Sequence, residues 1–318
     1  MNSDLQLIAE KACVAWGGYS VPPKLIKHRE NAVFSVILKN KGRAALRLHR
    51  PGYKDVKEIK SEMWWTKVLA EKGFPVPSPI ANLEGDDLVQ VSTELVATMI
   101  EWVDGKPIGD STIPIQGSGK KIYHDLGKLL AELHNITESL SFPDWFLRPL
   151  WDIDGLLGES PNWGKFWESP HLSQEEKKIL SLVRNNAQVM LEEYKLDGVQ
   201  TSLIHADAIR ENVFIGKKGL TLIDFDDCGY GFPLYDLATA TIQSLEENNY
   251  QNRCDAILEG YGKERSLSHA DINLFPTFAM LRVLATSAWI IPRAPAGSSV
   301  IEVYKKRALK EAIKFLKK

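Results

Sequence analysis

The stretch Leu203–Ala238, LIHADAIRENVFIGKKGLTLIDFDDCGYGFPLYDLA, contains two aspartates and an asparagine at informative intervals between short apolar runs. Asp207 lies five residues before Asn212, and Asp224 follows twelve residues after that. The first interval is that of the template H-R-D-x-x-x-x-N, in which the aspartate accepts the proton of an attacking hydroxyl. We expect Asp207 to be this catalytic base. Asn212 and Asp224 are expected to hold magnesium ions, which prefer hard oxygen ligands.

The residues between Asn212 and Asp224 predict a β-hairpin. Two short β-type runs, Val213–Ile215 and Leu220–Ile223, flank the glycine-containing loop Gly216–Gly219. A hairpin brings the residue before its first strand close to the residue after its second strand. We therefore expect Asn212 and Asp224 at one end of the hairpin, where they can share metal ions. A lone aspartate after a strand is often a plain turn former, but the ordered combination of these features favours a site.

This stretch resembles the catalytic segment of the aminoglycoside phosphotransferase and choline kinase superfamily, a set of small-molecule kinases with a protein-kinase-like fold. Its tail, IDFDDCGYGFPLYDLA, is most similar to the homoserine kinase type II and bacterial stress-response kinase branches. The resemblance implies a bilobal α+β fold, with a small antiparallel β N-terminal lobe and a larger, mainly helical C-terminal lobe. Two positions depart from the family pattern: Ala206 stands where members usually have Gly, and Ile209 where many have His. Neither position supplies the base or a metal ligand.

The chain length fits two such lobes. The 318 residues suffice for one bilobal protein or two modest domains. We expect a nucleotide-binding lobe over residues 1–103 and a catalytic and substrate-binding lobe over residues 104–318. Apolar residues make up 44% and charged residues 25%, as in an ordinary globular protein.

Charge, cysteine content and hydropathy exclude several classes of partner. The formal net charge of -2 gives no electrostatic reason to expect a nucleic acid or an anionic membrane as partner. Three widely spaced cysteines form neither a disulfide framework nor a metal motif, so we expect buried thiols. No run of about 18 apolar residues is present. The N-terminus has Asp4, Glu10 and Lys11 among its apolar residues, unlike a signal peptide. We expect the protein to stay in the cytoplasm.

The N-terminal part contains a candidate phosphate-binding arginine. Ala32–Leu38 and Ala44–Leu48 are β-rich runs around the turn Lys39–Gly42, and no G-x-G-x-x-G loop precedes them. Arg47 falls where the lysine of V-A-I-K would fall. A basic side chain there could meet the α- and β-phosphates of ATP and pair with a helix glutamate. The alternative is a solvated strand residue.

The next segment supplies the glutamate. Lys54–Lys72 has the periodicity of a helix and ends before Gly73-Phe74-Pro75-Val76-Pro77. Glu62, followed by Leu69 and this glycine- and proline-containing stop, resembles the E…L…G-x-P-V-P segment of the superfamily. Glu62 is therefore the expected partner of Arg47, with Glu58, one helical turn earlier, as the alternative.

A second pair of strands leads to a candidate adenine-binding hinge. Leu88–Val91 and Leu95–Ile100 are β-type runs, and the second ends at Glu101-Trp102-Val103-Asp104-Gly105. This resembles the family's hinge, in which backbone groups of Ile100, Glu101 and Trp102 would bind the adenine edge. The alternative interpretation, a strand that simply ends in an Asp-Gly turn, agrees with these residues equally well.

The C-terminal part is helical by pattern. We expect helices over 123–137, 172–194, 252–259, 274–289 and 303–316. His134 is interpreted as structural, and Asp236 as an anchor of the catalytic loop.

Four tryptophans, at 145, 151, 163 and 167, could line a substrate pocket or fill a gap between helices. Of Asp226 and Asp227, one is expected to help hold metal and the other to bind backbone donors.

These features predict an ATP-dependent phosphotransferase that moves the γ-phosphate to a hydroxyl of a small molecule with Mg²⁺. The acidic residues Asp207, Glu211, Asp226 and Asp227 favour an acceptor that carries an amine. A serine/threonine protein kinase of the stress-response type is one alternative, although the chain shows no A-P-E segment. A catalytically inactive, nucleotide-binding regulator is the other, supported by Ala206 and Ile209. Homoserine, a choline-like alcohol, an aminoglycoside and other metabolites all fit the pattern as acceptors.

Overall fold

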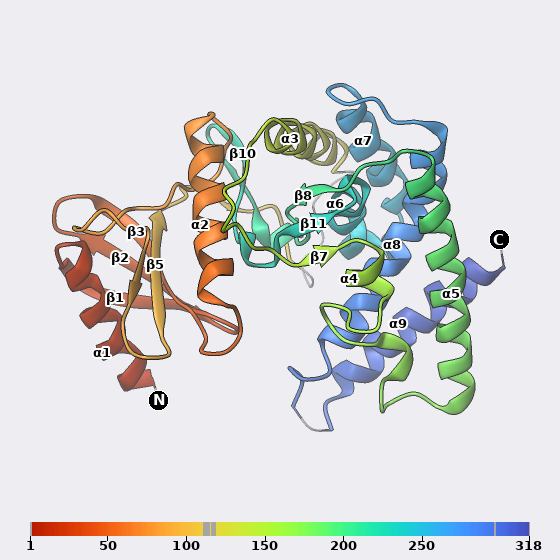
Figure 1. The fold of residues 1–318 in the computed structure, drawn as a ribbon, viewed down its shortest axis with the longest axis horizontal. Helices are drawn as coiled ribbons and strands as arrows, with labels where there is room; N and C mark the ends of the chain where they lie inside the picture. The colour runs from red at the N-terminus through yellow and green to blue at the C-terminus, as the bar shows by residue number, and fades with distance from the viewer. Residues whose placement is uncertain (1, 111–114, 116–118, 296, 318) are drawn as a thin grey trace. The chain divides into compact units, whose positions relative to one another are not determined.

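The computed structural model describes residues 2–110, 115, 119–295 and 297–317. It divides into two compact units, whose elements are labelled in Figure 1. The first unit consists of Met1–Lys106, Ser141–Arg148 and Phe214–Asp226, and the second of Pro107–Leu140, Pro149–Val213 and Asp227–Lys318. The first unit thus takes two segments from later in the chain.

The first unit is built on an antiparallel sheet in the order β1-β2-β3-β5-β4. Its strands are β1 (Tyr19–His28), β2 (Ala32–Leu38), β3 (Gly42–Leu48), β4 (Leu88–Gln90) and β5 (Val96–Glu101). Alternate residues of β2 and β3, among them Phe34, Val36, Leu46 and Leu48, are buried in one hydrophobic core. Helix α1 (Asn2–Cys13) adds Ala9 and Ala12 to this core. The predicted antiparallel N-terminal region is confirmed.

Most of strand β1 has no clear signal in the sequence, because it contains Pro22 and Pro23. Proline has no N–H to donate to a sheet ladder and is therefore confined to edge strands and bulges. β1 is an edge strand, and its register with β2 shifts between Val21 and Lys24, where the prolines lie. The strand is compatible with its prolines because only one side of it is paired.

Helix α2 (Val56–Glu71) begins at a capping box formed by Asp55 and Glu58. It buries Ile59, Met63, Trp65 and Leu69, whose spacing places them on one side of the helix. The chain leaves the helix through Gly73, whose φ of 84° is the left-handed conformation that glycine adopts without strain. The orange helix in Figure 1 is α2.

Two later segments of the chain are bonded to α2 or to the loop that follows it. The hairpin of β9 (Val213–Gly216) and β10 (Gly219–Leu222) joins it through a bond of 3.1 Å from the N–H of Leu222 to the carbonyl of Pro75. In the segment 141–148, the N–H of Leu147 donates to the hydroxyl of Ser61 over 2.8 Å. The predicted hairpin is thus bonded to the loop that follows α2, and the segment 141–148 to α2 itself.

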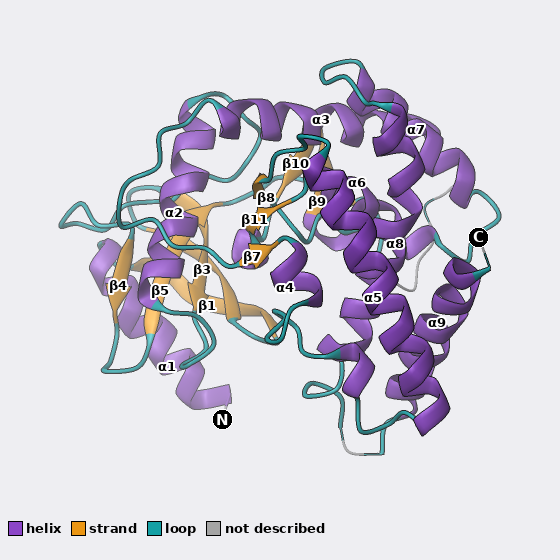
Figure 2. Cartoon of the chain, turned by 45° about the vertical axis from the view of Figure 1, so that its right-hand side comes forward, coloured by secondary structure: helices purple, strands orange, loops and turns teal. Residues whose placement is uncertain are grey.

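The second unit is mainly helical, as expected, and most of its length is drawn as helix in Figure 2. Its helices are α3 (Lys120–Glu138), α4 (Ile153–Leu157), α5 (Gln174–Leu196), α6 (Pro233–Thr241), α7 (Tyr250–Gly262), α8 (His269–Trp289) and α9 (Ser299–Leu316). A small sheet has the order β7-β11-β8, from Leu150–Trp151, Gly229–Gly231 and Ser202–Ile204. The two-residue strand β6 (Lys106–Pro107) lies at the boundary between the units.

Helices α3 and α7 approach each other closely because each has a glycine at the contact. A Cβ on Gly127 would lie 2.1 Å from the carbonyl oxygen of Ile257, and one on Gly260 would lie 1.9 Å from that of His124. Any larger side chain would push the helices apart. The contact brings together His134 of α3 and Tyr261 of α7, which are bonded to each other over 3.0 Å.

Two expectations from composition can be compared with the structure. All three cysteines are free and buried. Within the part of the chain that the structure describes, no helix has the length and apolar character needed to span a membrane.

Candidate active site

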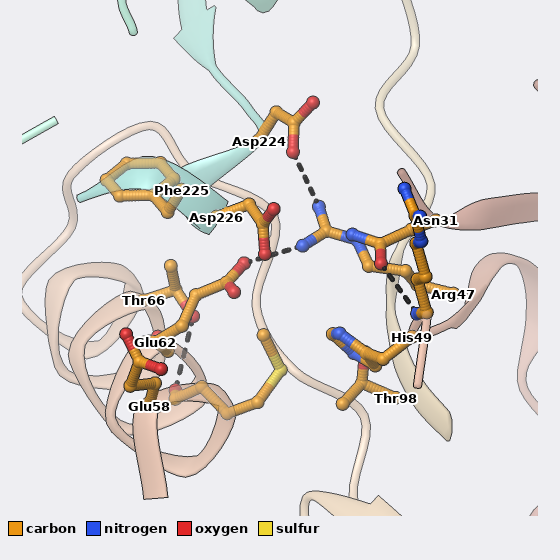
Figure 3. A network of polar contacts seen from close by, with 12 residues as sticks. Asn31, Arg47, His49, Glu58, Glu62, Thr66, Thr98, Asp224, Phe225 and Asp226 are labelled. Carbon is orange, nitrogen blue, oxygen red and sulfur yellow. Dashed lines mark hydrogen bonds and ion pairs between the residues drawn. The ribbon is translucent and has the colours of Figure 1, made fainter. Parts of the chain in front are cut away.

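Arg47 lies at the centre of an ion-pair network in the first unit (Figure 3). Its Nη1 is 2.8 Å from Oε1 of Glu62, and its Nη2 is 3.0 Å from Oδ1 of Asp224. Arg47 comes from β3, in the interior of the sheet, and Glu62 from the middle of α2. Sheet, helix and the chain after the hairpin therefore meet at one guanidinium. The ion pair expected between Arg47 and Glu62 is present.

The network keeps Arg47 charged although the side chain is 12% exposed. Burial lowers the pKa of Arg47, but the carboxylates of Glu62, Asp224 and Asp226 outweigh burial and raise that pKa above its usual value. Oε2 of Glu62 is also buried and has no hydrogen-bond partner among the described residues. The buried carboxylate of Glu62 therefore depends on Arg47 for its charge partner, because a buried carboxylate without a cation is costly.

Glu58, the alternative partner expected for Arg47, caps helix α2 instead. Its Oε2 accepts a hydrogen bond of 2.9 Å from the backbone N–H of Asp55, which closes the capping box of α2. The carboxylate is therefore engaged at the helix N-terminus, where negative charge is favoured. Glu62, one turn later, is the residue that faces Arg47.

Asp224 has a backbone conformation that is unusual for a residue with a side chain. Its φ is 64°, in the left-handed region, which aspartate tolerates better than most residues. The side chain is 37% exposed, in contrast to the buried Glu62 on the other side of Arg47. The ring of the next residue, Phe225, packs edge-on against Trp65 of α2 with centroids 5.2 Å apart. Asp224 is thus an accessible carboxylate on a well-anchored turn.

Arg148 fastens this turn to α2 and was not singled out from the sequence. Its Nη2 donates to the carbonyl of Asp226 over 2.5 Å and lies 3.4 Å from that of Phe225. Its Nη1 donates to the carbonyl of Glu58 over 3.0 Å. Arg148 is 5% exposed, so these bonds are shielded from water. One side chain therefore ties the chain that follows Asp224 to the helix that carries Glu62.

The three predicted hinge residues lie at the end of β5. Ile100 pairs with Ala45 of β3, and Glu101 is the last residue of the strand. The N–H of Glu101 donates to the carbonyl of Ser78 over 2.9 Å, so the fold itself uses this donor. Trp102 follows the strand, and the guanidinium of Arg43 lies 3.6 Å from the centre of its ring.

The loop of the second unit that carries Asp207 is anchored to the carboxylate of Asp236. This carboxylate accepts hydrogen bonds from the N–H groups of His205, over 2.8 Å, and Ala206, over 2.6 Å. His134 lies 3.1 Å from Asp236 through Nε2 and 3.0 Å from the hydroxyl of Tyr261 through Nδ1. Both His134 and Asp236 are fully buried. His134 therefore contacts the anchor of the loop, in line with a structural role.

The carboxylate of Asp207 is held through both oxygens. Nδ2 of Asn212 donates to Oδ2 over 2.8 Å and to the backbone carbonyl of Asp207 over 2.9 Å. Nη2 of Arg282 donates to Oδ1 over 2.5 Å. Because the amide nitrogen of Asn212 faces Asp207, its amide oxygen Oδ1 points to the other side. The loop thus presents a fixed carboxylate and a separate amide oxygen.

Arg282 is a second residue that sequence reasoning missed. It lies in α8, and 75 residues separate it from Asp207. One signal was present: Arg282 is the sole charged residue between Leu274 and Trp289. An arginine in such an apolar stretch is rarely buried unless it is paired. The stretch alone does not show where the partner lies.

The tryptophans have several roles. Trp151 and Trp167 are buried, at 1% and 4% exposure, and fill space in the second unit. Trp151 also donates its indole N–H to the carbonyl of Asp227 over 2.7 Å. Trp163 is half-buried and lies against Arg282, with 4.3 Å between guanidinium carbon and ring centre. Trp145 lies in the first unit, under the ammonium group of Lys60.

Known proteins share this fold and sequence pattern. Residues 24–271 match the model of the phosphotransferase enzyme family. The homoserine kinase of Agrobacterium fabrum is 25% identical over 260 residues, which cover 79% of this chain and 72% of that protein. The homoserine kinase of Bartonella henselae is 28% identical over 251 residues, covering 74% and 70%. The structure of a microcompartment-associated aminopropanol kinase matches with a TM-score of 0.80 and 25% identity, covering 96% and 94%.

The family match spans Arg47, Glu62 and Asp224 in the first unit and Asp207 and Asn212 in the second. The matched relatives are kinases that phosphorylate a hydroxyl group. This chain is a kinase of the same kind, and ATP use follows from the family. The protein therefore belongs to the phosphotransferase enzyme family.

Proposed function

We propose that this protein transfers the γ-phosphoryl group of ATP to the hydroxyl of a small molecule that carries an amine, with Mg²⁺ as the metal. The observation that supports this most strongly is the carboxylate of Asp207, which Asn212 holds at 2.8 Å on an anchored loop. Nucleotide binding by residues 1–103 and catalysis by residues 104–318 are part of the proposal.

Asp207 is the proposed catalytic base. A carboxylate has about four lone-pair sites, so it can hold Asn212 and Arg282 and still accept the proton of a hydroxyl. Phosphoryl transfer depends mainly on positioning and charge neutralisation, and a carboxylate fixed through both oxygens provides the positioning. The bond between the N–H of Asp207 and Nδ1 of His205, at 3.2 Å, also limits movement of the loop.

Asn212 and Asp224 are the proposed magnesium ligands. The donor chemistry fits, because an amide oxygen and an accessible carboxylate are hard oxygen donors. Asn212 directs its amide nitrogen to Asp207, which leaves Oδ1 as its ligand atom. Asp224 is 37% exposed, as a ligand must be. A bound magnesium ion would neutralise phosphate charge during transfer.

Arg47 is the proposed phosphate-binding residue, and Glu62 orients it. The guanidinium remains positive and offers a planar set of donors that matches phosphate oxygens. For the adenine, we propose backbone groups of Ile100, Glu101 and Trp102. Because the N–H of Glu101 is bonded to Ser78, Glu101 would contribute its carbonyl, and Trp102 would supply the donor.

The proposed amine on the acceptor is supported by the relatives, since both homoserine and aminopropanol carry an amine as well as a hydroxyl. The number of acidic residues in the sequence is weaker support than it first suggests. Asp207 is paired with Arg282, and Glu211 accepts a bond of 2.6 Å from Gln243. The count of acidic residues in the sequence therefore overstates the negative charge near a bound acceptor.

The inactive-regulator alternative rested on Ala206, where the family usually has glycine, and on Ile209, where many members have histidine. Ala206 adopts a φ of 64°, the left-handed conformation that a glycine would also adopt. The left-handed turn is therefore present with alanine at this position, and Asp207 is bonded to Asn212 and Arg282. No described contact favours the inactive alternative over catalysis.

The test is Mg²⁺-dependent ATP consumption with homoserine, aminopropanol, choline, an aminoglycoside and a generic protein acceptor. We expect turnover with an amino alcohol and a loss of about 10²- to 10⁴-fold in Asp207→Ala, the range for a general base. Asp255→Ala, at an exposed position of α7, is the matched control and keeps full activity. Turnover of the protein acceptor alone would contradict the small-molecule assignment. Activity that survives Asp207→Ala would contradict the role of the base.

A further inference from the structure

Arg282 contacts the proposed catalytic base although nothing in the kinase template calls for an arginine there. Its Nη2 lies 2.5 Å from Oδ1 of Asp207, while Asn212 binds the other oxygen, Oδ2, over 2.8 Å. A carboxylate that is bonded through one oxygen can still turn about its last side-chain torsion. With both oxygens bonded, the plane of the Asp207 carboxylate is fixed.

Arg282 also holds the backbone turn in front of Asp207. Ala206 has a φ of 64°, a conformation that its Cβ disfavours. Its N–H donates to Asp236 over 2.6 Å, and its carbonyl accepts from Nη1 of Arg282 over 3.3 Å. The strained residue is therefore bonded on both sides. The same guanidinium binds the turn and the carboxylate that the turn presents.

The guanidinium itself is well fixed. Arg282 is 4% exposed, and the ring of Trp163 covers it at 4.3 Å. Burial lowers the pKa of Arg282, but Asp207 and then Tyr235 outweigh this effect and raise it, so the side chain stays protonated. A fixed, charged group beside Asp207 can impose its own geometry on the carboxylate.

Stability alone is a poor explanation for this pair. A buried ion pair is often no more stabilising than apolar side chains of similar volume. α8 has no other charged residue between Leu274 and Trp289 and is mostly apolar there, so an apolar residue would suit its surroundings. An apolar residue in place of Arg282 would remove one of the two contacts that hold the Asp207 carboxylate. The pair is therefore better explained by orientation than by stability.

We propose that Arg282 is a positioning residue for phosphoryl transfer, which holds the Asp207 carboxylate and the Ala206 turn so that Asp207 faces the acceptor hydroxyl. The proposal rests on the role of Asp207 in the proposed function. It predicts that Arg282 affects the chemical step, without a direct part in nucleotide binding.

The chain offers a control with the same kinds of contact in Arg184, whose side chain is 20% exposed where that of Arg282 is 5% exposed. Its guanidinium lies 4.4 Å from the ring centre of Trp167 and donates to the carbonyl of Leu157 over 2.6 Å. It also donates to the carboxylate of Glu159 over 3.0 Å. Arg184 thus has the same three kinds of contact as Arg282: a tryptophan face, a backbone carbonyl and a carboxylate. Only Arg282 has the carboxylate of Asp207.

The experiment compares Arg282→Lys and Arg282→Met with Arg184→Lys, Arg184→Met and Asp207→Ala in the full chain. Homoserine and aminopropanol serve as acceptors, and thermal unfolding and ATP affinity show that each variant is folded. We expect Arg282→Met to lower kcat by about 10- to 100-fold with an unchanged KM for ATP, as a misplaced catalytic group does. Arg282→Lys should recover part of kcat, and the Arg184 variants should keep the wild-type kcat.

A crystal structure of Arg282→Met adds a readout that needs no acceptor. We expect the Asp207 carboxylate to rotate or to occupy more than one orientation. A folded Arg282→Met with the wild-type kcat, or with Asp207 unmoved, would overturn the proposal, and so would a change in KM for ATP alone. Unimpaired activity in Asp207→Ala would instead remove the proposed function itself, which separates the two failures.

Discussion

Arg47 and Asp224 form an ion pair of 3.0 Å although 177 residues separate them in the chain. The same guanidinium holds Glu62 at 2.8 Å, so Arg47 links the sheet to the proposed metal-binding turn (Figure 3). Asp224 thus has a positively charged partner in Arg47, the proposed phosphate-binding residue. The pair therefore connects the two proposed roles.

Arg47→Lys should raise the KM for ATP by about tenfold. A lysine keeps the charge but loses the planar fork that reaches two acceptors, and one lost charged hydrogen bond is equivalent to roughly a factor of ten. Steady-state kinetics at saturating acceptor measure this change. Arg50→Lys, at an exposed position near the same strand, is the control. An unchanged KM for ATP would argue against phosphate binding by Arg47.

Ala206→Gly should stabilise the fold by about 0.5 kcal/mol. Glycine removes the strain of the left-handed conformation, although it also increases the freedom of the unfolded chain. Ala206→Val should have the opposite effect, because a β-branched residue tolerates this φ poorly. Denaturant unfolding of both variants measures the difference. A destabilised glycine variant would show that Ala206 is not strained.

Arg148→Met should destabilise the first unit by about 2 kcal/mol, because it leaves the buried carbonyl of Asp226 without this donor and removes the bond to the carbonyl of Glu58 in α2. The Mg²⁺ concentration for half-maximal activity should also rise, since Asp226 follows Asp224 closely in the turn. Chemical unfolding and a Mg²⁺ titration of activity test both effects. Arg29→Met, an exposed arginine of the first unit, should change neither. Equal values for the two variants would show that Arg148 does not fix the turn.

Stability should fall in mild acid because of His49. The ring is 4% exposed, and burial, then the charge of Arg47, holds the pKa of His49 well below its usual value of 6.5. His49 therefore becomes protonated near pH 6.5 in the unfolded chain but stays neutral at that pH in the folded chain. The free energy of unfolding should drop below that pH by up to about 1.4 kcal/mol per pH unit.

His49→Gln tests the source of this pH dependence. The variant should lose less stability between pH 6.5 and pH 5 than the wild type, as followed by urea unfolding at each pH. His28→Gln, at an exposed position, should follow the wild type. If His49→Gln and the wild type lose stability in parallel, another group causes the decline.

The parts of the site that depend on local spacing could be predicted from the sequence. Asp207 and Asn212 are five residues apart on one loop, and their hydrogen bond follows from that spacing. The hairpin after Asn212 is also local, because two β-type runs flank a glycine turn. Arg47 and Glu62 are 15 residues apart on different elements, so their pairing needed the family pattern as well.

The contacts that hold the site together depend on tertiary structure and left little trace. Arg282 reaches Asp207 across 75 residues, and Arg148 reaches Asp226 across 78. Backbone carbonyls accept the bonds of Arg148, and a carbonyl has no sequence signature. Strand β1 was hidden for a related reason, because proline contradicts strand propensity unless the strand lies at an edge.

The most direct test of the account is ³¹P NMR of the reaction with ATP, Mg²⁺ and either homoserine or aminopropanol, in wild type and in Asp207→Asn. The account predicts a phosphomonoester of the acceptor in equal amount to ADP, with formation slowed by at least about 10²-fold in the variant. Release of inorganic phosphate without a phosphorylated acceptor, or an equal rate in Asp207→Asn, would contradict it.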